Sequence, residues 1–325
     1  MKNNSFRSIA ALFLSLVLLG SLVTPVLAVT TTNTIYIENA EDLKALSKNC
    51  SLDTWSKSKT VVLKNNVSLE GIAFEPIPTF AGTFDGAGFT ISGLSVTDSY
   101  SPSGLFAHTQ EGAVIKNLHV SGCVTPVGEK TFVGGIVGIN GGSIIDCTFT
   151  GTVIGEKKVG GIAGHNALTG TVKRCTVMGE IIGENMTGGV VGENLGMITE
   201  CENEAKVNTI SVDPHISLDE LNAALTVDIT KLPTLDTATT TNDTGGIAGF
   251  SSGMVIGCKN TATIGYPHIG YNVGGIVGRS CGHLANNTNS GEIYGRKDVG
   301  GIVGQMEPFI SLELSEDLLG DPSSP

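Results

Sequence analysis

The sequence predicts an all-β protein, a parallel and right-handed β-solenoid, and three observations lead to this prediction. A Gly-Gly core of the pattern VGGIVG recurs six times, with spacings of 26, 28, 57, 29 and 26 residues between copies. A repeat period in the twenties indicates a solenoid. Only 5% of the 325 residues are aromatic whereas 44 are Gly, which suits a thin structure with little core to fill. Each repeat also ends in an alternating, strand-like pattern.

The repeats begin at Val133, Val159, Thr187, Thr244, Val273 and Val299, and aligning them on the Gly pair gives columns of matching residues. The residue after the pair is Ile136, Ile162, Val190, Ile247, Ile276 or Ile302. A second apolar column contains Ile144, Val172, Ile198, Val255 and Leu284, and three residues later come Cys147, Cys175, Cys201, Cys258 and Asn287. The last columns contain Gly151, Gly179, Ala205, Ala262 and Gly291, then Val153, Ile181, Val207, Ile264 and Ile293.

The end of each repeat alternates with period two, which predicts a strand with one face inside. The VGGIVG run is interpreted as a second strand, in which Gly allows a sharp bend or a close approach of another backbone. Because one repeat cannot bury its own inner face, we expect seven or so coils to stack, each strand pairing with its copy in the next coil.

The repeated GGIVG core, followed by a turn, I-x-x-C and G-x-V, resembles the GLUG motif. The resemblance covers most of residues 74–304, with residues 76–96 similar to an opening coil. It implies a β-helical repeat region of a bacterial surface protein, as in the repeat regions of immunoglobulin A1-specific zinc metallopeptidases. Their zinc signature H-E-x-x-H is absent, since none of the six His residues precedes a Glu. The proteolytic activity is therefore not carried over.

The regions flanking the coils predict further parts of the chain. Lys2 and Arg7, an apolar run over residues 9–23 and small residues ending at Ala28 indicate an export signal, with an uncleaved membrane anchor as the alternative. Asn39 is a candidate N-cap for a helix in an N-terminal α/β cap. The predicted order is signal peptide 1–28, cap 29–72, coils 73–209, helix-containing insertion 210–242, coils 243–304 and tail 305–325. The tail suggests a fragment of a longer protein.

Four of the seven cysteines share one inward column, namely Cys147, Cys175, Cys201 and Cys258. Neighbouring strands lie about 4.8 Å apart with parallel Cβ directions, which does not suit a disulfide. We expect a stack of buried, inert thiols. Cys123 should face outward, while the redox states of Cys50, Cys123 and Cys281 stay open. Metal binding is disfavoured because no C-x-x-C pair is present.

Asn203, Asn260 and Asn289 form another inward column, and we interpret them as an amide stack rather than a sugar-binding row. A carbohydrate-active enzyme would need acids and bases that converge on one groove. Charged residues do lie near the Cys column, at Asp146, Lys173, Arg174, Glu200 and Lys259, but they change identity between coils. They are interpreted as a solvated face without a paired site.

The functional hypothesis is a non-enzymatic, secreted or cell-surface repeat protein that acts as a rigid scaffold or adhesin-like binding module. The sequence suggests no catalytic, cofactor-binding or metal-binding residue. The net charge of −12 argues against a nucleic-acid partner, so the expected partner is a protein or glycan at a cell surface. The insertion is the best candidate for a specific contact, and the alternative is an inert decoration packed against the neighbouring coil. The alternatives are a carbohydrate-active parallel β-helix enzyme and a non-catalytic repeat region of a larger surface peptidase.

Overall fold

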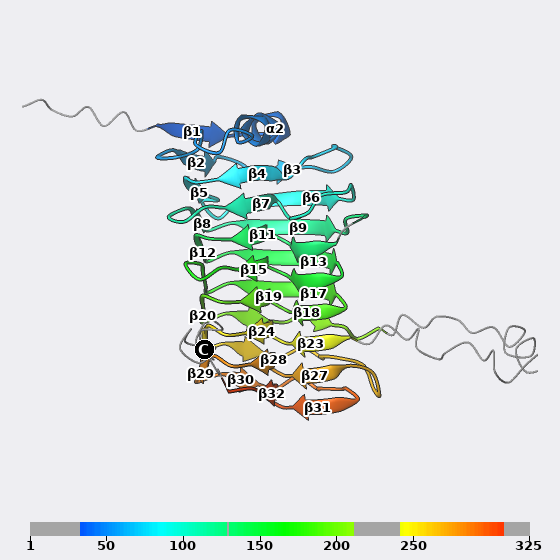
Figure 1. Ribbon diagram of the computed structural model, residues 1–325. Helices are drawn as coiled ribbons and strands as arrows, with labels where there is room; N and C mark the ends of the chain where they lie inside the picture. Colours follow the sequence, from blue (N-terminus) through cyan, green and yellow to red (C-terminus); the bar gives the residue numbers. More distant parts are fainter. Residues whose placement is uncertain (1–32, 129, 211–240, 309–325) are drawn as a thin grey trace, which may run out of the picture. The chain divides into compact units, whose positions relative to one another are not determined.

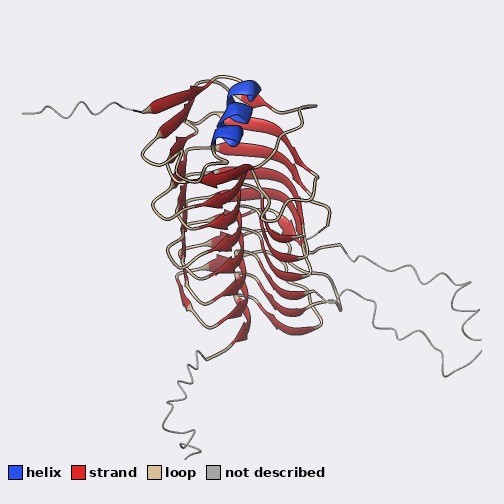
Figure 2. Ribbon diagram, turned by 45° about the horizontal axis from the view of Figure 1, so that its top comes forward, coloured by secondary structure: helices blue, strands red, loops and turns tan. Residues whose placement is uncertain are grey.

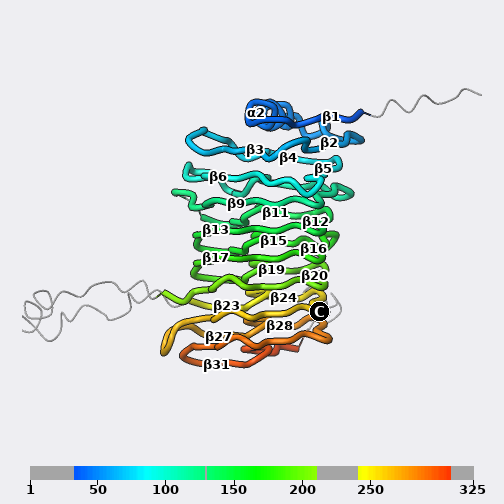
Figure 3. Tube along the Cα trace, turned by 180° about the vertical axis from the view of Figure 1, so that it is seen from behind, coloured from blue at the N-terminus to red at the C-terminus, as the bar shows by residue number. Residues whose placement is uncertain are grey.

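The computed structural model describes residues 33–128, 130–210 and 241–308, and these residues form an all-parallel β-solenoid (Figure 1). Four sheets, here called A to D, run along the stack of coils. A complete coil passes through one strand of sheet D, then one of C, one of A and one of B. Figure 3 shows the coils following one another in chain order, so that each coil contacts its sequence neighbours.

The strands of each sheet are given in spatial order. Sheet A contains β1 (Thr34–Ile37), β2 (Thr60–Leu63), β5 (Thr83–Asp85), β8 (Val114–Lys116), β12 (Ser143–Ile145), β16 (Thr171–Lys173), β20 (Met197–Thr199), β25 (Met254–Ile256) and β29 (His283–Ala285). Sheet B contains β3 (Val67–Ser68), β6 (Thr90–Val96), β9 (His119–Val124), β13 (Thr148–Ile154), β17 (Thr176–Ile182), β21 (Glu202–Asn203), β26 (Lys259–Asn260) and β30 (Thr288–Asn289), with β22 (Lys206–Val207) also paired to β17. Sheet C contains β4 (Ile77–Phe80), β7 (Phe106–Thr109), β11 (Val137–Asn140), β15 (Ala163–Asn166), β19 (Val191–Asn194), β24 (Ala248–Ser251), β28 (Val277–Ser280) and β32 (Val303–Met306). Sheet D contains β10 (Thr131–Gly134), β14 (Lys157–Gly160), β18 (Asn185–Gly188), β23 (Asn242–Gly245), β27 (Tyr271–Gly274) and β31 (Lys297–Gly300).

The strands pair so that equivalent residues of successive coils lie opposite one another. Ile144 of β12 is opposite Ile115 of β8 on one side and Val172 of β16 on the other. Val153 is likewise opposite Ile181. These inward residues are fully buried, and together they make one continuous apolar core. The predicted columns are therefore confirmed as stacks of side chains.

The VGGIVG run is not one strand, contrary to the expectation from sequence. In the first full coil β10 ends at Gly134 and β11 begins at Val137, so the chain bends at Gly135 and Ile136. Ile136 is fully buried at this corner. The apolar pattern has the same appearance whether the backbone continues or turns inward, which is why the corner was missed.

Each Gly of the motif has a different neighbour that leaves no room for a Cβ atom, as the next coil shows. A Cβ at Gly160 would collide with the backbone of the same corner, at the Ala163 carbonyl. At Gly161 it would enter the core and collide with the Val177 side chain. At Gly164 it would collide with the sheet D backbone of the preceding coil. Close approach of the backbones of sheets C and D therefore explains why the motif repeats these glycines.

The N-terminal end of the stack contains the one helix found in the described ranges, α2 (Ala40–Asn49) (Figure 2). Asn39 caps it as predicted, because its Oδ1 accepts hydrogen bonds from the backbone N–H groups of Glu41 and Asp42 at 3.0 and 3.1 Å. Strands β1 and β2 pair in register with each other and with β5, so this region extends sheet A. Among the described residues sheet A thus has nine strands, more than the seven or so coils expected.

At the C-terminal end of the described coils, the inward-facing residues are more exposed to solvent. Ile302 is 40% exposed, whereas its counterparts Ile136, Ile162 and Ile276 are fully buried. None of the helices in the described part of the chain is long and apolar enough to cross a membrane. The predicted export signal at residues 1–28, the helix predicted in the insertion and most of the tail lie outside the described residues.

The glycine at the second position of the motif provides a matched test of coil packing. We expect Gly161→Ala to lower the free energy of unfolding by about 1–3 kcal/mol, because the added methyl group overpacks the core against Val177. Gly301→Ala places the same change in the last described coil, where no heavy atom lies within 4 Å of the new Cβ. Urea unfolding of both variants measures the difference. An equal decrease in the free energy of unfolding of the two variants would show that coil stacking is not the reason for glycine at this position.

Candidate binding surface

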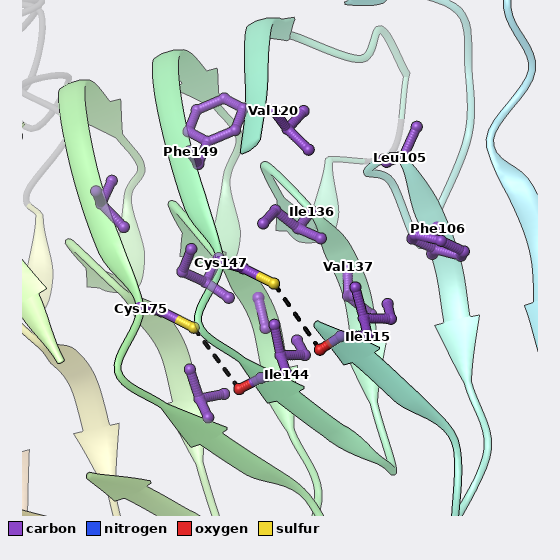
Figure 4. Close-up of a cluster of buried hydrophobic side chains, with 14 of the residues drawn as sticks. Leu105, Phe106, Ile115, Val120, Ile136, Val137, Ile144, Cys147, Phe149 and Cys175 are labelled. Carbon is purple, nitrogen blue, oxygen red and sulfur yellow. Dashed lines mark hydrogen bonds between the residues drawn. The ribbon is translucent and has the colours of Figure 1, made fainter. Parts of the chain in front are cut away.

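The cysteine column forms the inner corner between sheets A and B, as predicted. Cys147, Cys175, Cys201 and Cys258 are at most 1% exposed, and Cys123 faces outward. Each buried thiol of the column lies within hydrogen-bonding distance of two carbonyls, one two residues earlier in its own coil and one in the preceding coil. Figure 4 shows the contacts to the preceding coil, from Cys147 to Ile115 at 3.8 Å and from Cys175 to Ile144 at 3.6 Å. Burial raises the pKa of the Cys175 thiol well above its ordinary value. A buried neutral thiol is a poor nucleophile, so these cysteines are not suited to a reactive role. The column serves the packing of the core.

Asn287 replaces cysteine in the same column and keeps its bonding pattern. The Asn287 Nδ2 donates to the Val255 carbonyl at 2.8 Å, and its Oδ1 accepts from the Cys258 backbone N–H at 2.8 Å. Cys201 accepts from the Cys175 backbone N–H at 3.4 Å in the equivalent way. A polar residue is therefore tolerated at this corner because it satisfies the same donors and acceptors.

The predicted amide stack is confirmed on sheet B. Asn203 donates to Asn260 at 2.8 Å, and Asn260 donates to Asn289 at 2.7 Å. Asn203 also bonds both the N–H and the carbonyl of Ala205, and the strand breaks there into β21 and β22. Where Phe149 occupies this column instead, Gly151 adopts a φ of 151° and β13 continues through it. These amide groups therefore stabilise the fold, and the interpretation as a sugar-binding row is not needed.

A second buried amide stack, on sheet C, was missed from the sequence. Asn140 donates to Asn166 at 2.8 Å, Asn166 donates to Asn194 at 2.8 Å, and Asn194 donates to Ser251 at 3.0 Å. Thr109 closes the other end by donating to Asn140 at 2.7 Å. The signal was present, because Asn follows the third Gly of the motif by two residues in three successive repeats.

The charged residues near the cysteine corner lie on an exposed face, and several of them form ion pairs between coils. Arg174 makes a bidentate contact with Asp146 of the preceding coil, at 2.6 and 2.8 Å. Lys173 lies 3.5 Å from Glu200, and Lys259 lies 2.7 Å from Glu202. Each pair joins residues of opposite charge in successive coils. These pairs contribute little to stability at such exposed positions, and they do not form the two facing acids of a glycosidase.

A row of half-buried side chains lies along the seam where sheets C and D meet, and the sequence did not predict it. A residue of sheet D contacts the sheet C residue of the next coil. Phe132 meets His165 with ring centroids 5.9 Å apart, and Lys158 Nζ lies 2.7 Å from Glu193. In the coils after the insertion, Asp243 pairs with Arg279 at 2.9 Å. Phe132, Lys158 and Asp243 all have φ between 54° and 60°. This left-handed bulge is rare for residues other than Gly, so no sequence pattern marked it.

Two clusters on this seam contain charged side chains at largely buried positions. Glu193 is 9% exposed, and one of its carboxylate oxygens lies 2.7 Å from Lys158 Nζ and 2.6 Å from His165 Nδ1. Burial opposes ionisation of Glu193, but the contacts to His165 and Lys158 outweigh it and lower its pKa. In the second cluster the Arg279 guanidinium binds Asp243 and Glu307 and lies 4.6 Å from the Phe250 ring centroid.

In both clusters the charged groups face partners of opposite charge within the protein, so they stabilise the seam more readily than they bind a ligand. In the described ranges no group of three His, Cys, Asp or Glu side chains is placed to hold a metal ion. A depression of about 620 Å³ lies beside α2, lined by Lys44, Lys48 and Glu75 among others. Its walls also include Ala45, Ala73 and Pro78, and Lys44 Nζ lies 3.2 Å from the exposed Glu41 carboxylate.

The pH dependence of stability tests the Glu193 cluster. Because the folded-state pKa of Glu193 is lowered, its stabilising effect is complete above the unfolded value of about 4.3 and is lost as the pH falls through the folded value. We expect Glu193→Gln to cost about 1–3 kcal/mol at pH 7, and the difference from the parent protein to shrink below about pH 4. Urea unfolding across this pH range measures it.

Asp146→Asn is the matched control, because Asp146 is also ion-paired but is exposed. Its cost should be smaller throughout. A loss in Glu193→Gln that does not change with pH would contradict the ionic role of this carboxylate.

Comparisons with known proteins agree with the repeat and the fold. The family model of the GLUG motif matches residues 133–154. Halomucin from Haloquadratum walsbyi (strain DSM 16790 / HBSQ001) is 34% identical over 140 residues, which are 40% of this chain and 2% of halomucin. The chain thus spans a very small part of that protein.

A crystal structure from Bacteroides ovatus, provisionally described as an immunoglobulin A1 protease, has a TM-score of 0.55 and 16% sequence identity. The match covers 84% of this chain and 82% of that one. At this identity the likeness shows the fold alone. With six repeats of one motif stacked in register as coils, and with the family model on the first of them, the chain is a GLUG-repeat protein.

Proposed function

We propose that this chain is a non-enzymatic, exported or cell-surface repeat protein whose coils form a rigid scaffold with an adhesin-like binding role. The observation that carries the proposal is the contrast between the two sides of the coil wall. Inward residues repeat from coil to coil, as in the Cys and Asn columns, whereas outward residues change identity. A wall of this kind keeps its shape while its outer surface varies, which is how solenoids present binding faces.

Two further observations support a scaffold over a catalyst. The charged outward residues pair with one another between coils, as in Asp146 with Arg174 and Lys259 with Glu202. The buried cysteines of the column lie against backbone carbonyls, as for Cys147 and Cys201. Catalysis by acids or nucleophiles needs such groups to converge on a substrate-sized space.

The surface location rests on the predicted export signal at residues 1–28 and on the two similar proteins. A name that denotes a mucin and a provisional description as an immunoglobulin A1 protease both fit a protein that acts outside the cell. The activity of neither protein is transferred to this chain.

The proposal is tested with the full chain immobilised on beads. We expect the beads to adhere to intact cells or to extracellular matrix, and a heat-unfolded sample of the same chain to adhere no better than bare beads. In parallel, the soluble chain should release no new reducing ends from polysaccharides and no peptides from immunoglobulin A1. Product that accumulates with time and enzyme concentration would overturn the non-enzymatic role, and recovery of the protein from the cytoplasm of its producer would overturn the location.

A further inference from the structure

Tyrosines lie on the edge between sheets B and D. Tyr100, between Val96 of β6 and Ser103, packs against the core, and three more tyrosines follow the inserted residues. Before the insertion this edge is charged, with Lys130 Nζ 3.7 Å from Glu156. After it come Tyr266, Tyr271 and Tyr294, which are three of the five tyrosines of the chain. In the strand register Tyr294 follows the column of Ile181 and Ile264, and Tyr271 lies in the column of Asn185, Asn242 and Lys297. The coil core does not require rings at these positions, so they are available for contact with a partner.

Coil stacking brings the rings onto one patch, here called the tyrosine edge and defined as Tyr266, Tyr271, Tyr294 and Arg296. Ile264 and Ile293 are paired residues of successive coils, and the Tyr294 backbone N–H donates to the Ile264 carbonyl at 2.9 Å. The Arg296 backbone N–H donates to the Gly270 carbonyl at 2.9 Å, directly before Tyr271. Neighbouring coils are about 4.8 Å apart, so these side chains share one patch of surface.

The rings are held in place while part of each stays accessible. Tyr266 begins a tight turn that is closed by its bridge to Ile269, and it is 38% exposed. Tyr294 is 37% exposed, and its hydroxyl donates to Glu292 at 2.9 Å. The Arg296 guanidinium lies 5.8 Å from the centroid of the Tyr271 ring. An exposed aromatic ring on a rigid wall loses little conformational entropy when it binds a partner.

We propose that the tyrosine edge binds the pyranose rings of a glycan. This inference rests on the proposed adhesin-like function and names its ligand class. The C–H face of a pyranose ring can stack on the exposed tyrosine rings. Its hydroxyl groups can bond Glu292 and Arg296, which supply an acceptor and several donors.

A glycan fits this edge better than a folded protein does. A stable protein interface buries about 800 Å² on each partner around an apolar centre. Here polar and charged side chains separate the rings, with Glu292, Arg296 and Lys297 exposed between or beside them. One sugar unit needs only one or two accessible rings and a few hydrogen-bonding groups.

The tyrosine edge also borders the root of the insertion. The Tyr271 backbone N–H donates at 2.9 Å to the carbonyl of Thr241, which directly precedes β23. Insertions of solenoids tend to lie on the face that binds a partner. The position of the edge therefore agrees with a binding role for this side of the coil wall.

Affinity electrophoresis of the full chain tests the proposal, with chitosan oligosaccharide, mannan, xylan or hyaluronan in the gel. We expect at least one of these glycans to retard the parent protein. The double variant Tyr266→Ala with Tyr294→Ala should lose at least tenfold in affinity, and the corresponding double Phe variant should keep most of it because the rings remain. Tyr36→Ala is the matched control, since Tyr36 is a 52% exposed ring on β1 at the far end of the stack.

Unchanged thermal unfolding of the variants shows that a lost affinity is local. Absence of retardation by all four glycans would overturn the proposal, as would full retardation of the double Ala variant. Adhesion of beads to cells that the double Ala variant keeps would overturn the glycan site while leaving the proposed function in place. Adhesion that the variant loses, but that proteinase treatment of the cells also abolishes and periodate does not, would identify a protein partner and overturn the glycan class.

Discussion

The structure depends on the in-register stacking of equivalent residues from one coil to the next. Parallel pairing places each backbone group opposite its counterpart, so the inner side chains form columns of like on like. Such columns need side chains that pack or bond with copies of themselves. Branched apolar residues do so by packing, asparagines by donating each to the next, and cysteines through carbonyls of the preceding coil. This requirement explains why the same motif recurs along the sequence.

The glycines add a second constraint, which is the close approach of sheets C and D. The corner at Gly135 and Ile136 turns the chain so sharply that sheet D lies against sheet C of the neighbouring coil. Side chains on the outside of this seam then meet diagonally, one coil apart. Lys158 with Glu193 and Asp243 with Arg279 are complementary in charge, so each pair joins two successive coils across the seam. Outside the seam the surface is free to vary, and the tyrosine edge is one such variation.

Much of the fold could be predicted from the sequence because its signal is repeated. The alternation around Cys147 and Asn203 placed both residues inside the coil, and the structure confirms their stacks. The corner within VGGIVG could not be predicted, since the bend leaves the apolar pattern unchanged. Glu193 could not be paired with Lys158 because they lie in different sheets of successive coils. The tyrosines are evident in the sequence, but their proximity is not, because only the stacking of coils brings Tyr266 and Tyr294 onto one edge.

A double-mutant cycle between Asn166 and Asn194 tests the stacking most directly. Asn166 Nδ2 donates to Asn194 Oδ1 at 2.8 Å across two coils, although the residues are 28 positions apart in sequence. In-register stacking predicts a coupling energy of about 0.5–3 kcal/mol between Asn166→Ala and Asn194→Ala in urea unfolding. It predicts additive effects for Asn166→Ala with Asn260→Ala, which belong to different stacks. Additivity in the first pair would contradict the account.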